Sequence, residues 1–290
     1  MAARRSHGTV DDQARDYDAV LYLSFGGPEG PEQVLPFLAR VAAGRGVPPE
    51  RLDEVADHYR LFGGVSPLNA QSRAVIAALR EELAARGPHL PVYWGNRNAP
   101  PFLADTLRQM RADGIRRAVC FVTSPFSSYP SCHQYLEDLA RARADVGDGA
   151  PVVDKLRTFH DHPGFVEAQV RSVRVALHAV PEGRWDATHL AFTAHSIPIA
   201  LAAASDYEAQ LREASRLVAE RVGGDHVWEL VWQSRSGPAG VPWLEPDVVD
   251  HLDELASEGV TDVVVVPIGF VSDHLEVRYD LDVEAAARAA

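Results

Sequence analysis

Seven short apolar segments constrain the fold of this chain most, because each is followed by a loop and most by a stretch of helical pattern. Segments that are apolar throughout, rather than at alternate positions, are typical of parallel strands covered by helices on both faces. The sequence therefore predicts an α/β fold with parallel sheets. The expected strands are Ala19–Ser24, Val92–Gly95, Arg117–Thr123, Val152–Leu156, His189–Thr193, Val227–Trp232 and Asp262–Ile268.

An internal similarity indicates two domains of similar construction. Val20–Pro28 and Leu190–Pro198 each run from a strand into a loop that contains proline. We expect two Rossmann-like, doubly wound domains, at residues 16–124 and 125–290, joined near Ser124–Pro130. The expected helices are Ala70–Ala85, Pro101–Asp113, Cys132–Ala144, Gly164–Ala179, Asp206–Val222 and Glu245–Glu258.

The composition limits the classes of partner and compartment. A formal net charge of -13 argues against nucleic acid, which usually meets a basic face. No apolar run approaches the length of a membrane span, and Met1–Gly8 has no apolar core behind its arginines, so it does not read as a signal peptide. Two cysteines make no disulfide framework. We expect a cytoplasmic protein, and a monomer because no feature suggests an obligate interface.

Three carboxylates follow the last apolar strand at steps of four residues. Val263–Phe270 leads into a helical pattern in which Glu276, Asp280 and Glu284 lie on one face. Like charges at this spacing repel, so the row requires a cation, transferred protons or solvent. Glu276 has a second interpretation, because Asp273 and Glu276 also fit a capping box at the start of the helix.

A histidine stands at the end of another expected strand. His195 follows the strand that begins at His189, and ligands of open α/β sheets bind outside the carboxyl ends of the strands. A neutral imidazole opposite a line of carboxylates suits metal handling and proton removal. The structural alternative is a histidine at a strand end, with Ser196 capping the next helix.

Five motifs, in this order along the chain, resemble the signatures of the ferrochelatase family. The similarity extends from about Asp18 to Glu284. The motifs are Ser24-Phe-Gly-Gly-Pro28, Gly63-Gly-Val-Ser-Pro-Leu68, Ala194-His-Ser-Ile-Pro198, Trp232-Gln-Ser-Arg-Ser-Gly-Pro238 with Pro242-Trp-Leu-Glu-Pro246, and Gly269-Phe-Val-Ser-Asp-His-Leu-Glu-Val-Arg-Tyr-Asp280.

The resemblance implies a lyase that inserts ferrous iron into a porphyrin held in a cleft between the two domains. Phe25 and the segment Ser127–Cys132 most resemble the actinobacterial branch, which is associated with coproporphyrin III and its conversion to coproheme. Two alternatives stay open: insertion into protoporphyrin IX, or a truncated, inactive porphyrin- or haem-binding protein. Besides the porphyrin and iron, the implied partners are other haem-pathway enzymes, in transient contact.

The resemblance also assigns roles to individual residues. His195 and Glu276 are the expected catalytic residues, and together with Asp280 they are the expected iron ligands. A solvated arginine is an equal alternative for one of the expected porphyrin contacts, Arg45, and core packing is an equal alternative for another, Trp232. The expected porphyrin contacts are Phe25, Arg45, Ser66, Tyr129 and Trp232.

The cysteines and the C-terminal residues limit what this chain can assemble. Val283–Ala290 is a helical pattern without a glycine stop, and the family continues further, so we expect a truncated sequence. Cys132 lies where the actinobacterial enzymes supply one ligand of a [2Fe-2S] cluster, whose other three ligands lie near the family's C-terminus. Cys120 falls within a strand and is expected to be buried. The cluster is therefore not expected in this chain.

Overall fold

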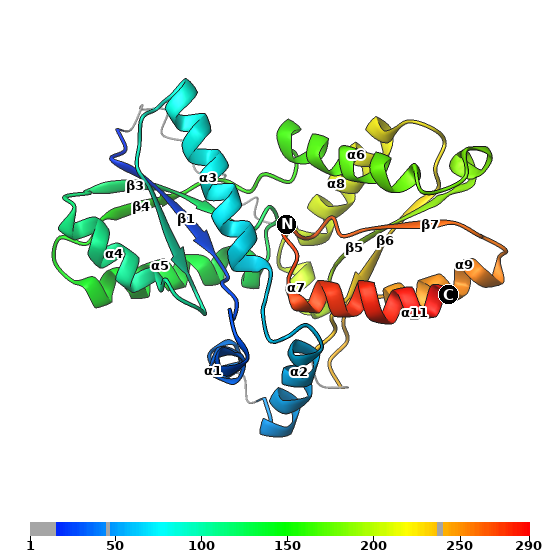
Figure 1. The fold of residues 1–290 in the computed structure, drawn as a ribbon, viewed down its shortest axis with the longest axis horizontal. Coiled ribbons are helices and arrows are strands. Elements are labelled where there is room, and N and C mark those ends of the chain that lie inside the picture. Colours follow the sequence, from blue (N-terminus) through cyan, green and yellow to red (C-terminus); the bar gives the residue numbers. More distant parts are fainter. Residues whose placement is uncertain (1–15, 45–46, 237–239) are drawn as a thin grey trace, which may run out of the picture.

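The protein, described by a computed structural model, contains two parallel β-sheets with helices on both faces (Figure 1). The structure describes residues 16–44, 47–236 and 240–290. The strand order is β2-β1-β3-β4 in the first sheet and β6-β5-β7 in the second. The named strands of both sheets pair in parallel, which confirms the expected fold class. The strands are β1 (Ala19–Ser24), β2 (Val92–Asn96), β3 (Arg117–Val122), β4 (Val152–Lys155), β5 (His189–His195), β6 (Trp228–Gln233) and β7 (Val263–Val266).

Helices connect the strands, as the alternating pattern predicts. Two of them, α1 and α2, lie between β1 and the first expected helix. Within the described residues, the helices are all too short or too polar to cross a lipid bilayer. The α-helices are α1 (Pro31–Ala42), α2 (Pro49–Leu61), α3 (Leu68–Arg86), α4 (Leu103–Ala112), α5 (Gln134–Val146), α6 (Pro163–Leu177), α7 (Ile199–Ala203), α8 (Tyr207–Val222), α9 (Val248–Ser257), α10 (Leu275–Val277) and α11 (Ala286–Ala289).

The first sheet is covered by α3 on one face and by α4 and α5 on the other. Successive side chains of a strand point to opposite faces, so a strand buried on both sides must be apolar throughout. In β1, Leu21 packs with Leu107 of α4 and Leu139 of α5. Val20, the preceding residue, packs with Ile76 of α3 on the opposite face.

The second sheet has β5 as its central strand, and the same alternation decides which way its residues face. Phe192 packs with Val170 of α6 on one face. Ala191 packs with Leu252 of α9 on the other. His195 lies four residues beyond Ala191, so alternation places its side chain on the α9 face, at the carboxyl end of the sheet.

One helix, from Leu275 to the C-terminal alanines, carries the row of carboxylates along the α9 face. Its middle section, η3 (Arg278–Ala285), is a π-helix between α10 and α11. Its hydrogen bonds run from residue i to i+5, so each turn holds more residues than an α-helical turn, and residues four apart stay close to one line. Asp280 accordingly experiences the charges of both Glu276 and Glu284.

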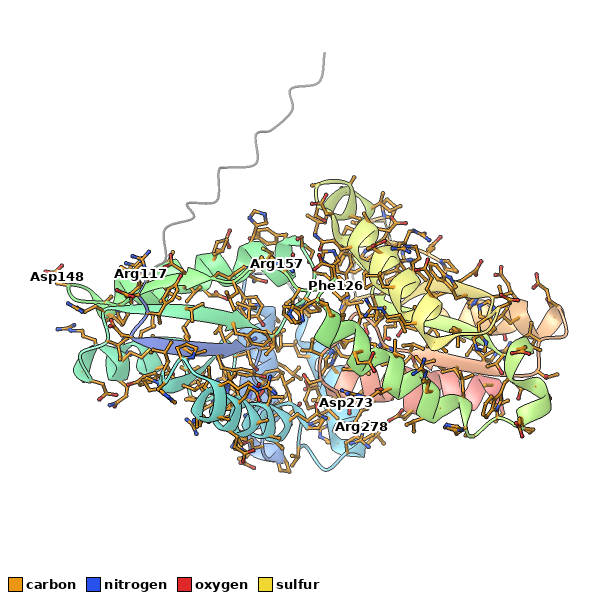
Figure 2. The ribbon with its side chains drawn as sticks, turned by 90° about the horizontal axis from the view of Figure 1, so that it is seen from above. Arg117, Phe126, Asp148, Arg157, Asp273 and Arg278 are labelled. Atoms are coloured by element: carbon orange, nitrogen blue, oxygen red, sulfur yellow. The ribbon has the colours of Figure 1, made fainter. Side chains whose placement is uncertain are left out.

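The two halves meet where this helix contacts α1 and α2. Leu275 is buried in a cluster with Phe37 of α1 and Tyr59 of α2. His58 of α2 stacks on Tyr279, with 3.7 Å between the ring centroids and 8° between the planes. Helix α2 therefore covers the start of the carboxylate-bearing helix, although more than 200 residues separate them. Figure 2 shows Asp273 and Arg278 at this junction between the halves.

The connection after β3 touches the second half before the chain returns to the first sheet. Phe126 is 1% exposed and packs in the core of the second half, against Tyr207 of α8 (Figure 2). The chain then forms α5 and β4, and β4 pairs with β3. The domain boundary between residues 124 and 125 stays a prediction. Strand β4 lies on the C-terminal side of that boundary, but its pairing with β3 places it in the first sheet.

The close approach of Gly269 to β5 generates a stability prediction. A Cβ on Gly269 would lie 2.6 Å from the Cβ and 2.8 Å from the Cα of Ala194, the residue before His195. The backbone of β5 cannot yield easily, because β6 and β7 hold it on both sides. We expect Gly269→Ala to lower the free energy of unfolding by about 1–3 kcal/mol, measured by urea denaturation. Gly183→Ala is the control, since a Cβ at that position would meet no atom of the described residues within 4 Å. Equal effects of the two substitutions would contradict this account.

Candidate functional site

His195 lies at the carboxyl end of the central strand. One of its ring nitrogens is hydrogen-bonded to the backbone, and the other can bind a ligand. Its Nδ1 lies 2.5 Å from the backbone oxygen of Ser196. A carbonyl oxygen only accepts hydrogen bonds, so Nδ1 must carry the proton. In the neutral ring, Nε2 then has a free lone pair, which can accept a proton or bind a metal ion. The side chain is 33% exposed, so a ligand can reach this atom.

Glu276 faces this lone pair from the C-terminal helix. Its Oε2 lies 3.9 Å from Nε2 of His195 and 3.9 Å from Nδ1 of His274. These distances are too long for direct hydrogen bonds. A metal ion between the two atoms, with bonds of about 2.1 Å to each, would span such a distance at a ligand–metal–ligand angle wider than tetrahedral. Burial lowers the pKa of His274, which keeps that ring neutral beside the carboxylate. The group can thus accept a cation or protons between its members.

The capping interpretation of Glu276 is wrong in this structure. The helix begins at Leu275, its N-cap residue is His274, and no side chain caps it. Asp273 instead exchanges two hydrogen bonds with Gln71 of α3. Its backbone nitrogen donates to Gln71 Oε1 at 2.9 Å, and its carboxylate accepts from Gln71 Nε2 at 3.1 Å. Glu276 is left 51% exposed and available to a ligand.

Asp280 continues the row one turn further and is held by the end of β6. The hydroxyl of Ser234 donates a hydrogen bond to its carboxylate, and Gln233 Nε2 donates a weaker one at 3.4 Å. Burial raises the pKa of Asp280 to about 6, and the charges of Glu276 and Glu284 act in the same direction. Ser234 has a φ of +62°, unusual for a residue with a side chain and often found at functional sites.

Three residues of this site were not predicted from the sequence. Two of them lie within the motifs quoted above, and the third does not. His274 and Ser234 belong to the motifs that contain Glu276 and Trp232. Tyr59 comes from α2, and no local pattern marks it. Burial raises the pKa of Tyr59, and the nearby charge of Glu276 raises it further, so its phenol stays protonated as a possible hydrogen-bond donor.

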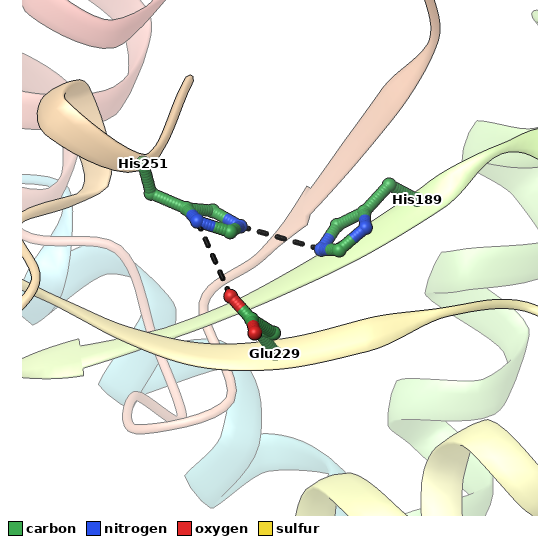
Figure 3. A group of neighbouring side chains, drawn as sticks. All are labelled: His189, Glu229 and His251. Carbon is green, nitrogen blue, oxygen red and sulfur yellow. Dashed lines mark hydrogen bonds and ion pairs between the residues drawn. The ribbon is translucent and has the colours of Figure 1, made fainter. Parts of the chain in front are cut away.

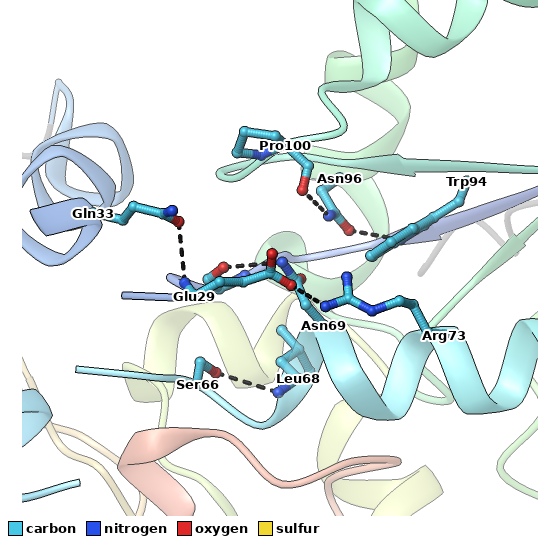
Figure 4. Close-up of polar contacts among 10 residues, drawn as sticks. Glu29, Gln33, Ser66, Leu68, Asn69, Arg73, Trp94, Asn96 and Pro100 are labelled. Atoms are coloured by element: carbon cyan, nitrogen blue, oxygen red, sulfur yellow. Dashed lines mark hydrogen bonds and ion pairs between the residues drawn. The ribbon is translucent and has the colours of Figure 1, made fainter. Parts of the chain in front are cut away.

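Two of the expected porphyrin contacts lie in the loops that follow β1 and precede α3. Phe25 is half-buried and packs in the same apolar cluster as Leu275, which brings it close to the start of the carboxylate helix. Ser66 is 3% exposed, and its hydroxyl accepts a hydrogen bond from the backbone nitrogen of Leu68 at 3.4 Å (Figure 4). Asn69 binds Gly27 by two further hydrogen bonds, so these loops hold each other.

Two of the remaining expected contacts, Trp232 and Tyr129, have partners of their own in the described part of the chain. Trp232 is 2% exposed and packs against Tyr207, so the core-packing alternative describes it in this structure. Tyr129 is 45% exposed and donates a hydrogen bond to Glu137 at 3.1 Å. Arg45 lies outside the described residues.

The cysteines of this chain do not fit a [2Fe-2S] cluster, which usually needs four thiolates. Cys120 is fully buried in β3, as expected, and burial raises the pKa of its thiol to about 12. Cys132 is half-buried in a short π-helix, η1 (Tyr129–His133), and neither cysteine is in a disulfide.

Comparison with known proteins gives one consistent family. Residues 17–290 match the family model described as Ferrochelatase. A coproporphyrin III ferrochelatase of Streptomyces griseus is 53% identical over an alignment of 291 positions, which covers 94% of this chain and 78% of that protein. A Frankia alni protein of the same name is 56% identical over an alignment of 293 positions, which covers 97% of this chain and 74% of that protein.

A solved structure from Deinococcus radiodurans, a multi-domain protein described as structurally similar to chelatases, shares the fold. Its TM-score is 0.50 at 17% identity, and the match covers 95% of this chain and 49% of that one. This likeness concerns the fold alone.

The raised pKa of Asp280 predicts a pH-dependent loss of stability. Because the folded-state value of about 6 lies above the ordinary 3.8, folding favours the protonated acid. That contribution is fully present below about pH 4 and is lost as the pH rises through 6. We expect Asp280→Asn to gain stability relative to the unmodified chain between pH 4 and 7, by at most about 3 kcal/mol. Urea denaturation at several pH values measures this.

The exposed Glu284, in the same row, supplies the control for this prediction. Glu284→Gln removes an equal charge without removing a buried acid. A parallel pH dependence of the two variants would show that the general charge of the row, rather than burial of Asp280, controls stability.

Proposed function

We propose that this chain, which belongs to the ferrochelatase family, is a lyase that inserts ferrous iron into coproporphyrin III to form coproheme. The observation that carries the proposal is the pairing of His195 Nε2 with the Glu276 carboxylate across 3.9 Å at the carboxyl end of the sheet. The coproporphyrin substrate is inferred from relatives that are 53–56% identical and are named coproporphyrin III ferrochelatases.

Insertion requires two proton transfers, because the free porphyrin carries two pyrrole N–H groups and the product carries none. His195 is the proposed acceptor, since its Nε2 lone pair is free while Nδ1 donates to Ser196. A positioned general base of this kind contributes about 10²–10⁴-fold to a rate. The iron enters as Fe2+ and leaves in the macrocycle, so the reaction needs no electron transfer.

The carboxylates supply a route for the cation or for the released protons. Glu276 and Asp280 are oxygen donors, and one imidazole beside them completes a set that suits a divalent ion which must also leave. Asp280, with a pKa of about 6, exchanges its proton near neutral pH, whereas an acid with the ordinary value would stay ionised. Glu284 extends the row toward solvent.

The side chains around His195 and Glu276 come from both halves of the chain, which supports the expected cleft between the halves. Tyr59 and Phe25 come from the first half, and His195, His274 and Glu276 come from the second. A planar macrocycle placed at this junction would contact both halves. Arg45 and Tyr129 stay candidate partners of the propionates. The cytoplasmic location, the monomeric state and contact with other haem-pathway enzymes also stay predictions.

The proposed function is tested by supplying Fe2+ without oxygen and following the absorption of the metallated product, with coproporphyrin III or protoporphyrin IX as acceptor. We expect turnover with coproporphyrin III and a kcat/KM at least tenfold lower with protoporphyrin IX. A preference for protoporphyrin IX would overturn the substrate assignment. Porphyrin binding without turnover of either would overturn the enzymatic one.

His195→Ala should lower kcat by at least about 100-fold, because the proton acceptor is lost. Porphyrin affinity, measured by fluorescence quenching, should change little. His195→Asn is the sharper variant, since its amide can keep the hydrogen bond to Ser196 while Nε2 is absent. Activity within tenfold of the unmodified chain in either variant would contradict the role of Nε2. His178→Ala, at the end of α6, controls for loss of a histidine elsewhere.

Glu276→Gln should cost more activity than Glu284→Gln, because Glu276 faces His195 whereas Glu284 lies two steps further along the helix. Both variants keep the size of the side chain and remove one charge. Melting temperatures should be compared first, so that a loss of folding is not taken for a loss of chemistry. Equal losses of activity at equal stability would mean that the carboxylates form no ordered route.

A further inference from the structure

A second group of metal-ligating side chains lies at the other end of the second sheet. His189 is the first residue of β5, Glu229 belongs to β6, and His251 belongs to α9. One donor atom from each lies within 4.8 Å of the other two (Figure 3). His189 and His195 are six positions apart on β5, which corresponds to roughly 20 Å along a strand. This group is therefore distinct from the candidate catalytic site.

Strand alternation and register explain why these three side chains converge. His189 and Ala191 lie two residues apart on β5, so their side chains share the face that α9 covers. Glu229 of β6 is paired in register with Ala191, which places its side chain on the same face. His251 lies on the buried side of α9, between Val248 and Leu252 in the sequence, and points down onto these two strands.

The spacing of the two imidazole nitrogens that face each other matches that around a small divalent cation, since His189 Nε2 lies 3.3 Å from His251 Nε2. Glu229 Oε2 makes its own 3.3 Å contact with the other nitrogen of that ring, His251 Nδ1. One ion takes only one nitrogen of a ring, and one donor atom from each of the three residues lies within 4.8 Å of the other two. Two ligands at about 2.0–2.1 Å from a tetrahedral ion are about 3.3 Å apart. The two imidazole planes are tilted by 57°, so the rings converge and do not stack.

One buried ring nitrogen of this group has no hydrogen-bond partner among the described residues. Two imidazole nitrogens in contact must share one proton between them. His251 is 2% exposed, and its buried Nδ1 has no hydrogen-bond partner in the described part of the chain. Nδ1 lies 3.3 Å from Glu229 Oε2 without forming a hydrogen bond, and the Glu229 side chain is 57% exposed, so its carboxylate is free to turn toward an ion. Orphaned buried polar atoms are rare and call for an explanation.

We propose that His189, His251 and Glu229 bind a divalent transition-metal ion of the Zn2+ type, which fastens α9 to the starts of β5 and β6. Two imidazoles and one carboxylate are a ligand set used for Zn2+ in proteins. Exposed Glu229 provides the route of entry from solvent, and Glu258, at the end of α9, adds negative charge nearby. The ion is a structural ligand, and its binding does not depend on the proposed iron insertion.

The test must separate this site from the candidate catalytic site, which also offers an imidazole and carboxylates. The full chain carrying His195→Ala and Glu276→Gln provides that background. Zn2+ is added to the metal-free protein and followed by calorimetry, and Co2+ is used as a spectroscopic probe of coordination. We expect one equivalent of Zn2+, the visible absorption of a nitrogen- and oxygen-ligated Co2+, and a melting temperature raised by about 5 °C at saturating Zn2+.

Three further substitutions in that background decide the assignment. Glu229→Gln and His251→Gln should each weaken Zn2+ binding by about tenfold or more and remove most of the thermal shift. Glu258→Gln removes an equal charge beside the site and should change the affinity by less than about threefold. Because Glu229 is exposed, its variant stays informative even if His251→Gln fails to fold. Absence of Zn2+ binding in the background protein overturns the proposal, as does binding that Glu229→Gln leaves unchanged.

Discussion

The parallel pairing of β5 with both of its neighbours is the constraint on which the candidate site depends. It fixes the register of β5 against β6 and β7, and it sends the ends of all three strands to the same edge. Alternation along β5 then decides that His195 faces the C-terminal helix rather than α6 and α8. A shift of one residue would turn His195 toward the apolar core formed by Phe192 and its neighbours, and the imidazole would lose its access to Glu276.

The row of like charges is tolerated because its carboxylates lie in different environments. Glu276 is exposed and flanked by two imidazoles, whereas Asp280 is partly buried and accepts a hydrogen bond from Ser234. The raised pKa of Asp280, about 6, lets its carboxylate take up a proton near neutral pH, which relieves repulsion between adjacent turns. The same inequality suits a path along which protons or cations pass between different sites.

The sequence was sufficient where structure follows from local pattern, and insufficient where it depends on distant partners. All seven strands were predicted, because an apolar strand covered on both faces is recognisable by itself. His195 and Glu276 were predicted from motifs, and the structure places them together. The capping alternative failed because Gln71, 202 residues away, engages Asp273. Nothing near Tyr59 in the sequence predicts its contact with the carboxylate helix, since packing of α2 creates it.

The two histidines at the ends of β5 share a face, yet an ion cannot pass between them through the interior. Ala191 and Thr193 lie between them and are fully buried, and Val231 and Leu252 close the apolar layer around Ala191. Moving a bare divalent ion through such a layer would require it to lose its hydration without gaining ligands, at a prohibitive cost in free energy. A cation at His189 and His251 can therefore influence chemistry at His195 only through the position and rigidity of β5 and α9. Its effect would appear in stability, and in the rate only as far as the strand itself shifts.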